Sequence, residues 1–313
     1  MSQTTRVLLT GARGQLGRAL IAALPSHLSG RAVELHAPSR VELDLADLPG
    51  LRRTVLDFRP HWVINAAAYT GVDQAEQDPD LAALVNAEAP RVIAEALAAM
   101  GQSHSCMLQI STDFVFDGNQ GSPYRPDQPV APLGVYGSSK ARGEAAVLAL
   151  LGSSQRAHVL RTSWVYAPWG SNFCLTMLKL LTQRAASGQP LTVVADQVGC
   201  PTSASGLAAA CWRVLELREH QHLPAILHWS DAGAATWYDF AAAIAERSLE
   251  LGLLQHTPDV VPIPTSLYPT PAQRPSYSLL DCTETRHCLD LYPCHWREAL
   301  VGVLEQVQLA ARM

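Results

Sequence analysis

Apolar runs alternate with amphipathic stretches through the first half of the chain. Predicted strands lie at 6–9, 32–36, 62–66, 107–111 and 157–162, and predicted helices lie between them at 15–24, 48–58, 79–100 and 136–151. A strand that is apolar along its whole length is buried on both faces, as in a parallel sheet covered by helices. The alternation therefore predicts an α/β fold with a doubly wound parallel sheet of the Rossmann type.

The second half of the chain is less regular. It predicts strands at 191–195 and 226–230 and helices at 172–186, 203–218 and 236–250. Prolines then crowd into residues 258–275, which favours extended loop and edge strand over helix. We therefore expect a smaller region here that packs against the sheet, which is a usual setting for a substrate cleft.

Composition narrows the classes of function. Hydrophobic residues make up 48% of the 313 positions and charged residues 16%, as expected for a chain with a large core. The net charge of −5 offers no basic surface, so we expect no nucleic-acid partner. No stretch reaches the roughly 18 apolar residues of a membrane span, and no leader-like segment follows the first residues. Together with an odd number of cysteines, seven, this indicates reduced thiols and a cytoplasmic protein without membrane attachment.

One group of cysteines and histidines could be imagined as a zinc site. Its members are Cys282, His287, Cys288, Cys294 and His295. The Cys-x5-Cys spacing lacks the closely spaced cysteine pair of structural zinc sites. We therefore expect no metal centre in this segment.

A glycine loop follows the first predicted strand directly. Gly11, Gly14 and Gly17 stand at the spacing Gly-x2-Gly-x2-Gly, at the start of a predicted helix. Such glycines allow a tight turn, a close approach of pyrophosphate and close packing of the helix, whose N-terminus attracts phosphate. An ordinary glycine-rich turn is the alternative. We expect residues 1–165 to form a dinucleotide-binding domain, to which the chain returns around 200–232, and residues 166–313 to form mainly a substrate-binding region.

The residues after the second predicted strand bear on the choice of cofactor. The run 37–40 contains no acid to hold a ribose 2′-hydroxyl, and Arg40 could pair with a 2′-phosphate. This favours NADPH, with NADH as a further possibility. A solvated loop charge is the alternative interpretation of Arg40. Asp44 and Leu45 follow on the same loop and could contact the adenine.

Candidate catalytic groups stand near two later elements. Tyr136 and Lys140 are four residues apart, so they share one face of a predicted helix. A cation near a phenol lowers the phenol pKa, which suits acid–base chemistry on a carbonyl group. Thr112 ends a predicted strand, at the edge where ligands bind in doubly wound sheets. The small residues around Ala68, after another strand, would let a nicotinamide pass close to the backbone.

These motifs, in this order, resemble the extended short-chain dehydrogenases/reductases. More narrowly, the chain is similar to the dTDP-4-dehydrorhamnose reductase family. The similarity rests on the strings at 65–76, 111–116, 161–166, 172–173, 196–202 and 274–275, which extend over nearly the whole chain.

The resemblance implies roles for individual residues. Tyr136 would be the proton donor, Lys140 would hold the nicotinamide ribose and lower the pKa of Tyr136, and Thr112 would supply a hydroxyl group. Cofactor contacts would come from Gly11, Gly14, Gln15, Leu16, Gly17, Arg40, Asp44, Leu45, Ala68, Tyr69, Thr70, Ile110, Tyr136 and Lys140. A nucleotide-sugar substrate would contact Thr112, Asp113, Trp164, Asn172 and Arg274. Trp164 could instead be a core residue.

The implied reaction is reduction of the C4 keto group of dTDP-4-dehydro-6-deoxy-L-mannose by NAD(P)H. Three alternatives stay open: another nucleotide-sugar 4-ketoreductase, an epimerase or dehydratase, and a non-catalytic dinucleotide-binding regulatory subunit. Phe114 follows Asp113 where dehydratases carry a second acid, which favours reduction. Some relatives form a dimer bridged by magnesium through an acid in the first helix. Ala19 stands at that position, which argues against a magnesium bridge and leaves a homodimer open.

Overall fold

A seven-stranded sheet forms the centre of the computed structural model, which describes residues 4–101 and 105–312. The strands are β1 (Thr4–Thr10), β2 (His27–Leu28), β3 (Arg31–His36), β4 (Trp62–Asn65), β5 (Cys106–Thr112), β6 (Ala157–Thr162) and β11 (Ile226–His228). Their order across the sheet is β11-β6-β5-β4-β1-β3-β2, and only the β2–β3 pairing is antiparallel. The predicted doubly wound parallel sheet is confirmed.

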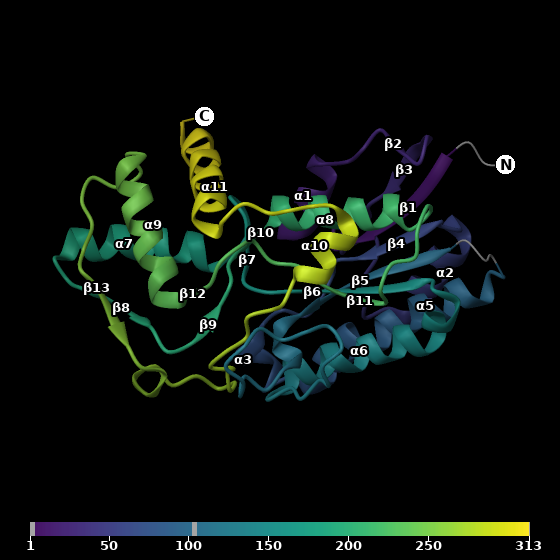
Figure 1. Ribbon diagram of the computed structural model, residues 1–313, viewed down its shortest axis with the longest axis horizontal. Helices are drawn as coiled ribbons and strands as arrows, with labels where there is room; N and C mark the ends of the chain where they lie inside the picture. Colours follow the sequence, from purple (N-terminus) through teal and green to yellow (C-terminus); the bar gives the residue numbers. More distant parts are fainter. Residues whose placement is uncertain (1–3, 102–104, 313) are drawn as a thin grey trace.

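Helices cover both faces of this sheet (Figure 1). α1 (Gln15–Ala22) and α8 (Ala204–Leu217) pack on one face, over a core that includes Leu9 and Leu207. α2 (Leu48–Phe58), α5 (Ala89–Ala99) and α6 (Val135–Leu151) cover the other face, where Ile93 and Val147 are fully buried. The strands are therefore shielded from water on both sides, as their continuous apolar runs predict.

The long helix predicted over 79–100 is interrupted. α4 (Pro79–Ala83) and α5 are joined by a π-helical turn, η1 (Leu84–Glu88). The extra residue in such a turn redirects side chains, and here it places Asn86 in the interior. A short helix that was not predicted, α3 (Val72–Ala75), precedes α4 in the chain.

The second region has its own hydrophobic core. It lies beside the sheet (Figure 1). Its helices are α7 (Phe173–Ser187), α9 (Trp237–Glu250) and α11 (Trp296–Ala311), with α10 (Thr283–Leu289) beside the sheet-covering α8. Its short strands pair as β7 (Val165–Tyr166) with β10 (Thr202–Ser203), β9 (Val198–Gly199) with β12 (Ala235–Thr236), and β8 (Leu191–Val194) with β13 (Val260–Ile263). The remaining single turns are η2 (Asp113–Val115), η3 (Gly152–Ser154) and η4 (Thr265–Leu267).

Three predicted helices in this half are confirmed to within one residue at each end. They were expected to begin at Asn172, Ser203 and Thr236, and each of these residues is the N-cap. In each case the side-chain oxygen accepts a hydrogen bond from the third backbone N–H of the helix. The capping residue therefore explains where each helix begins. Within the described residues, no helix is long and apolar enough to cross a membrane.

Candidate active site

A cavity of about 980 Å³ opens over the carboxyl ends of β1, β4 and β5. Of the predicted site residues, only Gly17 lies outside its lining. The others that line it are Gly11, Gly14, Gln15, Leu16, Arg40, Asp44, Leu45, Ala68, Tyr69, Thr70, Ile110, Thr112, Asp113, Tyr136, Lys140, Trp164, Asn172 and Arg274. The topology thus brings together residues from both halves of the chain.

The glycine loop lies where the strand order reverses, because β3 and β4 flank β1 on opposite sides. Gly11 has a φ of +74°, and a Cβ atom there would lie 2.7 Å from the backbone nitrogen of Ala67, beyond the end of β4. A Cβ on Gly17 would lie 2.1 Å from the carbonyl oxygen of Gly11. Gly17 therefore lets the first turn of α1 lie close against the glycine loop.

The loop and its surroundings fit an extended dinucleotide. Gly14 is the N-cap of α1 and has no side chain to accept a hydrogen bond from the first turn of the helix. The start of α1 therefore lies at the cavity with no side-chain cap on its backbone N–H groups. Such groups and the helix dipole favour phosphate. Arg13 and Arg40 also line the cavity. The Arg40 side chain is 79% exposed, and its Nε lies 3.7 Å from Oδ2 of Asp44.

A buried polar ladder crosses three strands beneath this loop. Thr10, Asn65 and Gln109 occupy matching positions on β1, β4 and β5. The Thr10 hydroxyl donates to Asn65 Oδ1 at 2.5 Å, and Asn65 Nδ2 donates to Gln109 Oε1 at 2.7 Å. Gln109 Nε2 in turn donates to the carbonyl oxygen of Ile110 at 2.9 Å. The ladder thereby reaches the carbonyl group of Ile110, a residue of the cavity lining.

Lys140 binds that same carbonyl group. Its Nζ donates to the oxygen of Ile110 at 2.6 Å, and the side chain is buried on α6. Burial lowers the pKa of Lys140 to about 8, although the Glu144 carboxylate one turn further along opposes this. Lys140 is therefore a positioned cation whose charge is marginal at weakly alkaline pH.

The pKa of Tyr136 differs from the expectation. Burial raises the pKa of Tyr136 to about 12; a hydrogen bond with Thr112 opposes this rise and the Asp113 charge adds to it. The expected lowering by Lys140 is not found, because desolvation dominates and the ammonium group is directed at the backbone of β5. The phenol is thus protonated at neutral pH.

Thr112 and Asp113 lie beside this phenol. The Thr112 hydroxyl donates to Asp113 Oδ1 at 3.0 Å and accepts from the N–H of Phe114 at 3.2 Å. Asp113 is 2% exposed, and burial raises its pKa to about 6 while hydrogen bonds with Ser278 and Thr112 oppose the rise. The Phe114 ring meets Tyr136 edge-on at 5.7 Å. The turn after β5 therefore adds one carboxylate and one aromatic contact to the site.

Two residues that sequence reasoning missed hold the start of α6. Glu76 Oε1 accepts a hydrogen bond from the N–H of Val135 at 2.8 Å. Asn86, from the π-helical turn, donates to the Tyr69 carbonyl oxygen and to the Ser139 hydroxyl, both at 3.0 Å. The string 65–76 contains Glu76, but no local pattern reveals either contact.

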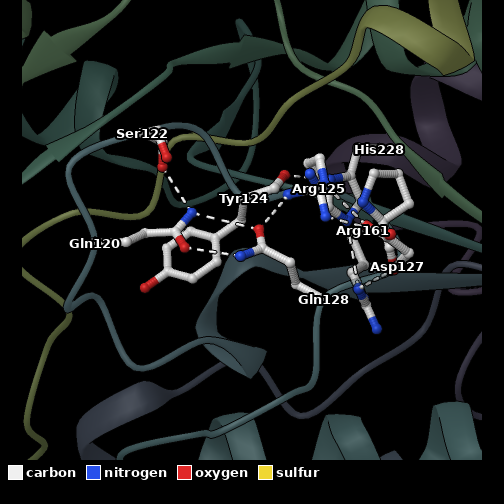
Figure 2. A network of polar contacts seen from close by, with 9 residues as sticks. Gln120, Ser122, Tyr124, Arg125, Asp127, Gln128, Arg161 and His228 are labelled. Atoms are coloured by element: carbon white, nitrogen blue, oxygen red, sulfur yellow. Dashed lines mark hydrogen bonds and ion pairs between the residues drawn. The ribbon is translucent and has the colours of Figure 1, made fainter.

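A further network of polar contacts holds the loop before α6 (Figure 2). Gln128 donates to Gln120 at 2.8 Å, and the N–H of Arg125 donates to Gln128 at 2.6 Å. Buried Arg161 donates to the Pro126 carbonyl oxygen at 3.3 Å while it forms an ion pair with Glu144 of α6 at 2.8 Å. This network ties the loop to β6 and to the helix that bears Tyr136 and Lys140.

Two predicted substrate contacts already have protein partners. Asn172 Nδ2 donates to Gln15 Oε1 at 2.8 Å, and its oxygen caps α7. Arg274 forms an ion pair with Asp73, with Nη2 2.8 Å from Oδ2. Both residues line the cavity, yet their polar groups are engaged in joining the second region to the first.

The cysteine and histidine group of the last segment is spread out. Cys282 is buried, whereas Cys294 is exposed. In the parts of the chain that the structure describes, no three His, Cys, Asp or Glu side chains form a group that could hold a metal ion. Ala19, on α1, is buried in the core.

Comparisons with known proteins agree over nearly the whole chain. A family model described as the RmlD substrate binding domain matches residues 5–309. A dTDP-4-dehydrorhamnose reductase from Aggregatibacter actinomycetemcomitans is 38% identical over 300 residues, which is 95% of this chain and 98% of that protein. A probable dTDP-4,6-dihydroxy-2-methyloxan-3-one 4-ketoreductase from Streptomyces antibioticus is 40% identical over 94% of this chain and 93% of that protein.

A solved structure gives the same result. The crystal structure of a dTDP-4-dehydrorhamnose reductase from Bacillus anthracis in complex with NADP matches with a TM-score of 0.84 and 31% identity. The match covers 97% of this chain and 99% of that one. The chain therefore belongs to the RmlD substrate binding domain family.

Proposed function

We propose that this protein reduces the C4 keto group of dTDP-4-dehydro-6-deoxy-L-mannose (dTDP-4-dehydrorhamnose) to give dTDP-L-rhamnose, with NADPH as the reductant. One observation carries the proposal: Tyr136, Thr112 and Lys140 line a single cavity with the glycine loop. The names of the Aggregatibacter and Streptomyces relatives both describe reduction of a keto group on a dTDP-linked sugar or of a related 4-keto compound.

The cofactor would lie along the carboxyl edge of the sheet. Gly11, Gly14, Gln15 and Leu16 would hold its pyrophosphate, and Ala68, Tyr69 and Thr70 would follow its nicotinamide half. When bound, NADPH supplies the hydride that adds to the C4 carbonyl carbon. The Bacillus anthracis relative binds NADP, and Arg40 supports a preference for the 2′-phosphate here.

The side chains of the site handle the proton. Tyr136 donates its phenolic proton to the C4 oxygen as the alcohol forms, and its raised pKa keeps that proton in place beforehand. Thr112 donates a hydrogen bond to the same oxygen, which requires its hydroxyl to turn away from Asp113. The phenolate of Tyr136 then remains, and Lys140, one turn away on the same face of α6, is the cation that would favour it.

Simple reduction is favoured over elimination or epimerisation. Elimination needs an acid and a base in addition to the tyrosine, and Phe114 supplies neither beside Asp113. We assign residues 1–165 mainly to cofactor binding and residues 166–313 mainly to substrate binding. We also place the reaction in the cytosol, where the thiols of Cys174, Cys200 and Cys211 would stay reduced.

An NADPH oxidation assay with product analysis tests the proposal directly. Purified protein is incubated with NADPH and dTDP-4-dehydrorhamnose, NADPH oxidation is followed by absorbance, and the product is analysed by NMR. We expect one NADPH to be oxidised for each sugar reduced and dTDP-L-rhamnose to form. We also expect dialysis of the protein to remove its cofactor. Absence of NADPH oxidation, or a product with the opposite configuration at C4, would contradict the proposal.

A further inference from the structure

Trp164 has an unusual backbone conformation in the cavity wall. Its φ is +47°, in the left-handed region that bulky side chains rarely adopt. Such a conformation is unfavourable and persists only when surrounding contacts hold it. The contacts that Trp164 makes with its neighbours must therefore hold it in this conformation.

Two residues of the second region, Trp237 and Gly199, contact the Trp164 indole. Its ring stacks on that of Trp237, with centroids 3.5 Å apart and planes 7° from parallel. On the β9 strand, a Cβ atom on Gly199 would lie 2.7 to 2.9 Å from the indole atoms of Trp164. Gly199 thus leaves the space that the ring occupies, and Trp237 covers one of its faces.

Trp237 is itself held at several points. It is the first residue of α9, whose N-terminus is closed by a capping box between Thr236 and Asp239. Its indole Nε1 donates to Gln197 Oε1 at 3.1 Å, and Phe173 packs on its ring at 4.6 Å. These contacts leave Trp237 little freedom to rotate.

Gln197 extends this chain of contacts to the surface. It is 5% exposed, and its Nε2 donates to the Thr265 hydroxyl at 3.0 Å. The Asp196 carboxylate accepts from both the N–H and the hydroxyl of Thr265, at 2.9 Å and 2.6 Å. A buried amide whose donor and acceptor are both satisfied specifies a single arrangement. Gln197 therefore fixes the plane of the Trp237 indole.

We infer that Trp237 is a positioning residue that sets substrate specificity by holding Trp164, with Gln197, in one orientation at the sugar end of the cavity. Both indoles line the cavity. Trp237 covers one face of Trp164 and Gly199 lies close against the indole, so the part of the ring that lines the cavity offers a fixed apolar surface. Such a surface suits the C–H face of a deoxygenated sugar ring better than a fully hydroxylated one. This inference rests on the proposed function for the identity of the ligand.

The experiment combines spectroscopy with binding. Two indoles stacked this closely give an exciton couplet in the far-ultraviolet circular dichroism spectrum. The couplet should be present in the wild type and absent in Trp237→Leu. Calorimetry then compares dTDP-L-rhamnose with dTDP alone. Trp237→Leu should weaken binding of dTDP-L-rhamnose about three- to tenfold, in line with the strength of aromatic contacts, and leave the affinities for dTDP and NADPH unchanged.

Matched variants separate the stack from its anchor. Trp237→Phe keeps a ring against Trp164 but loses the N–H donor, and Gln197→Glu keeps the acceptor, so each should weaken binding less than Trp237→Leu. A couplet that survives in Trp237→Leu would overturn the inference. So would equal affinity of wild type and Trp237→Leu for dTDP-L-rhamnose. If the wild type neither binds nor reduces the dTDP sugar, it is the proposed function that has failed, and the specificity role fails with it.

Discussion

Asp73 and Arg274 form a two-pronged ion pair between the two regions of the protein. Arg274 Nη2 lies 2.8 Å from Asp73 Oδ2, and Nη1 lies 3.1 Å from Oδ1. Asp73 also accepts from the N–H of Ala272 at 3.1 Å. The Arg274 guanidinium holds the pKa of Asp73 below its usual value. A residue predicted to contact the nucleotide-sugar substrate is therefore held by α3 at the cavity lining.

We predict that Asp73→Asn raises the KM for the dTDP sugar about fivefold, because an amide cannot hold the guanidinium by two acceptors and segment 270–274 loses its fixed position. The KM for NADPH should stay the same. Steady-state kinetics with each substrate varied in turn would test this. Arg274→Lys is the companion variant, because a lysine cannot form the two-pronged contact and should reproduce the defect. A fall in KM for the sugar in Asp73→Asn would show that the pair restrains Arg274 from its ligand.

Tyr136→Phe should lower kcat by about a hundredfold or more while the Kd for NADPH stays within about twofold of the wild type. Phenylalanine keeps the ring that packs on Phe114, so the fold around it is preserved. Stopped-flow measurement of hydride transfer, with NADPH binding followed by fluorescence quenching, separates the two effects. Wild-type turnover in this variant would exclude Tyr136 as the proton donor.

Arg40→Ala should raise the KM for NADPH about three- to tenfold and leave the KM for NADH unchanged, because only the former carries a 2′-phosphate. The modest size reflects the exposure of the Arg40 side chain. Arg53→Ala is the control, since Arg53 is an exposed arginine of α2 outside the cavity lining and its loss should not raise the KM for NADPH. Equal effects of Arg40→Ala on both cofactors would rule out phosphate recognition.

The sequence was most informative where structure depends on neighbours in the chain. α2 was predicted at its observed bounds, because Asp47 caps its start and Arg59 ends it in a left-handed conformation before Pro60. The glycine loop, the small residues around Ala68 and Thr112 were each predicted to follow or end a strand of the sheet, and all of them line one cavity.

The sequence was least informative where partners are far apart in the chain. The Asp73–Arg274 contact spans 201 positions and leaves no periodic trace. The π-helical turn that buries Asn86 follows from tertiary packing rather than from helix propensity. The raised pKa of Tyr136 follows from its burial, which depends on the folded structure. Asn172 and Arg274 were correctly placed at the cavity, but the contacts that occupy them could come only from the folded structure.

Asp113→Asn should stabilise the protein at alkaline pH by about 1–3 kcal/mol. Burial raises the pKa of Asp113 to about 6 from an ordinary value of 3.8. The protonated acid thus favours folding at pH values below about 4, and this contribution is lost as pH rises through about 6. Asparagine is neutral throughout, so its advantage should grow between these values and then level off. Urea unfolding of both proteins at about pH 4 and pH 8 measures the difference, and an advantage of equal size at both would contradict a buried, titrating carboxyl.

Glu76→Ala should lower kcat about tenfold and destabilise the protein by about 1 kcal/mol, with NADPH affinity unchanged. Gly134 is the N-cap of α6 but has no side chain to accept from the first turn. The Glu76 carboxylate takes that place through Val135, the residue before Tyr136. Without this acceptor the first turn should fray, and the phenol would lose its fixed position.

Two further variants test whether hydrogen-bond acceptance is what Glu76 contributes. Glu76→Gln keeps an acceptor oxygen and should restore most of the lost kcat. Gly134→Ala should reproduce the defect from the other side, because a Cβ there would lie 2.5 Å from Glu76 Oε1 and displace it. Kinetics, NADPH titration and thermal unfolding on all three proteins complete the test. If Glu76→Gln were as impaired as Glu76→Ala, the negative charge rather than the hydrogen bond to α6 would have to account for the effect on Tyr136.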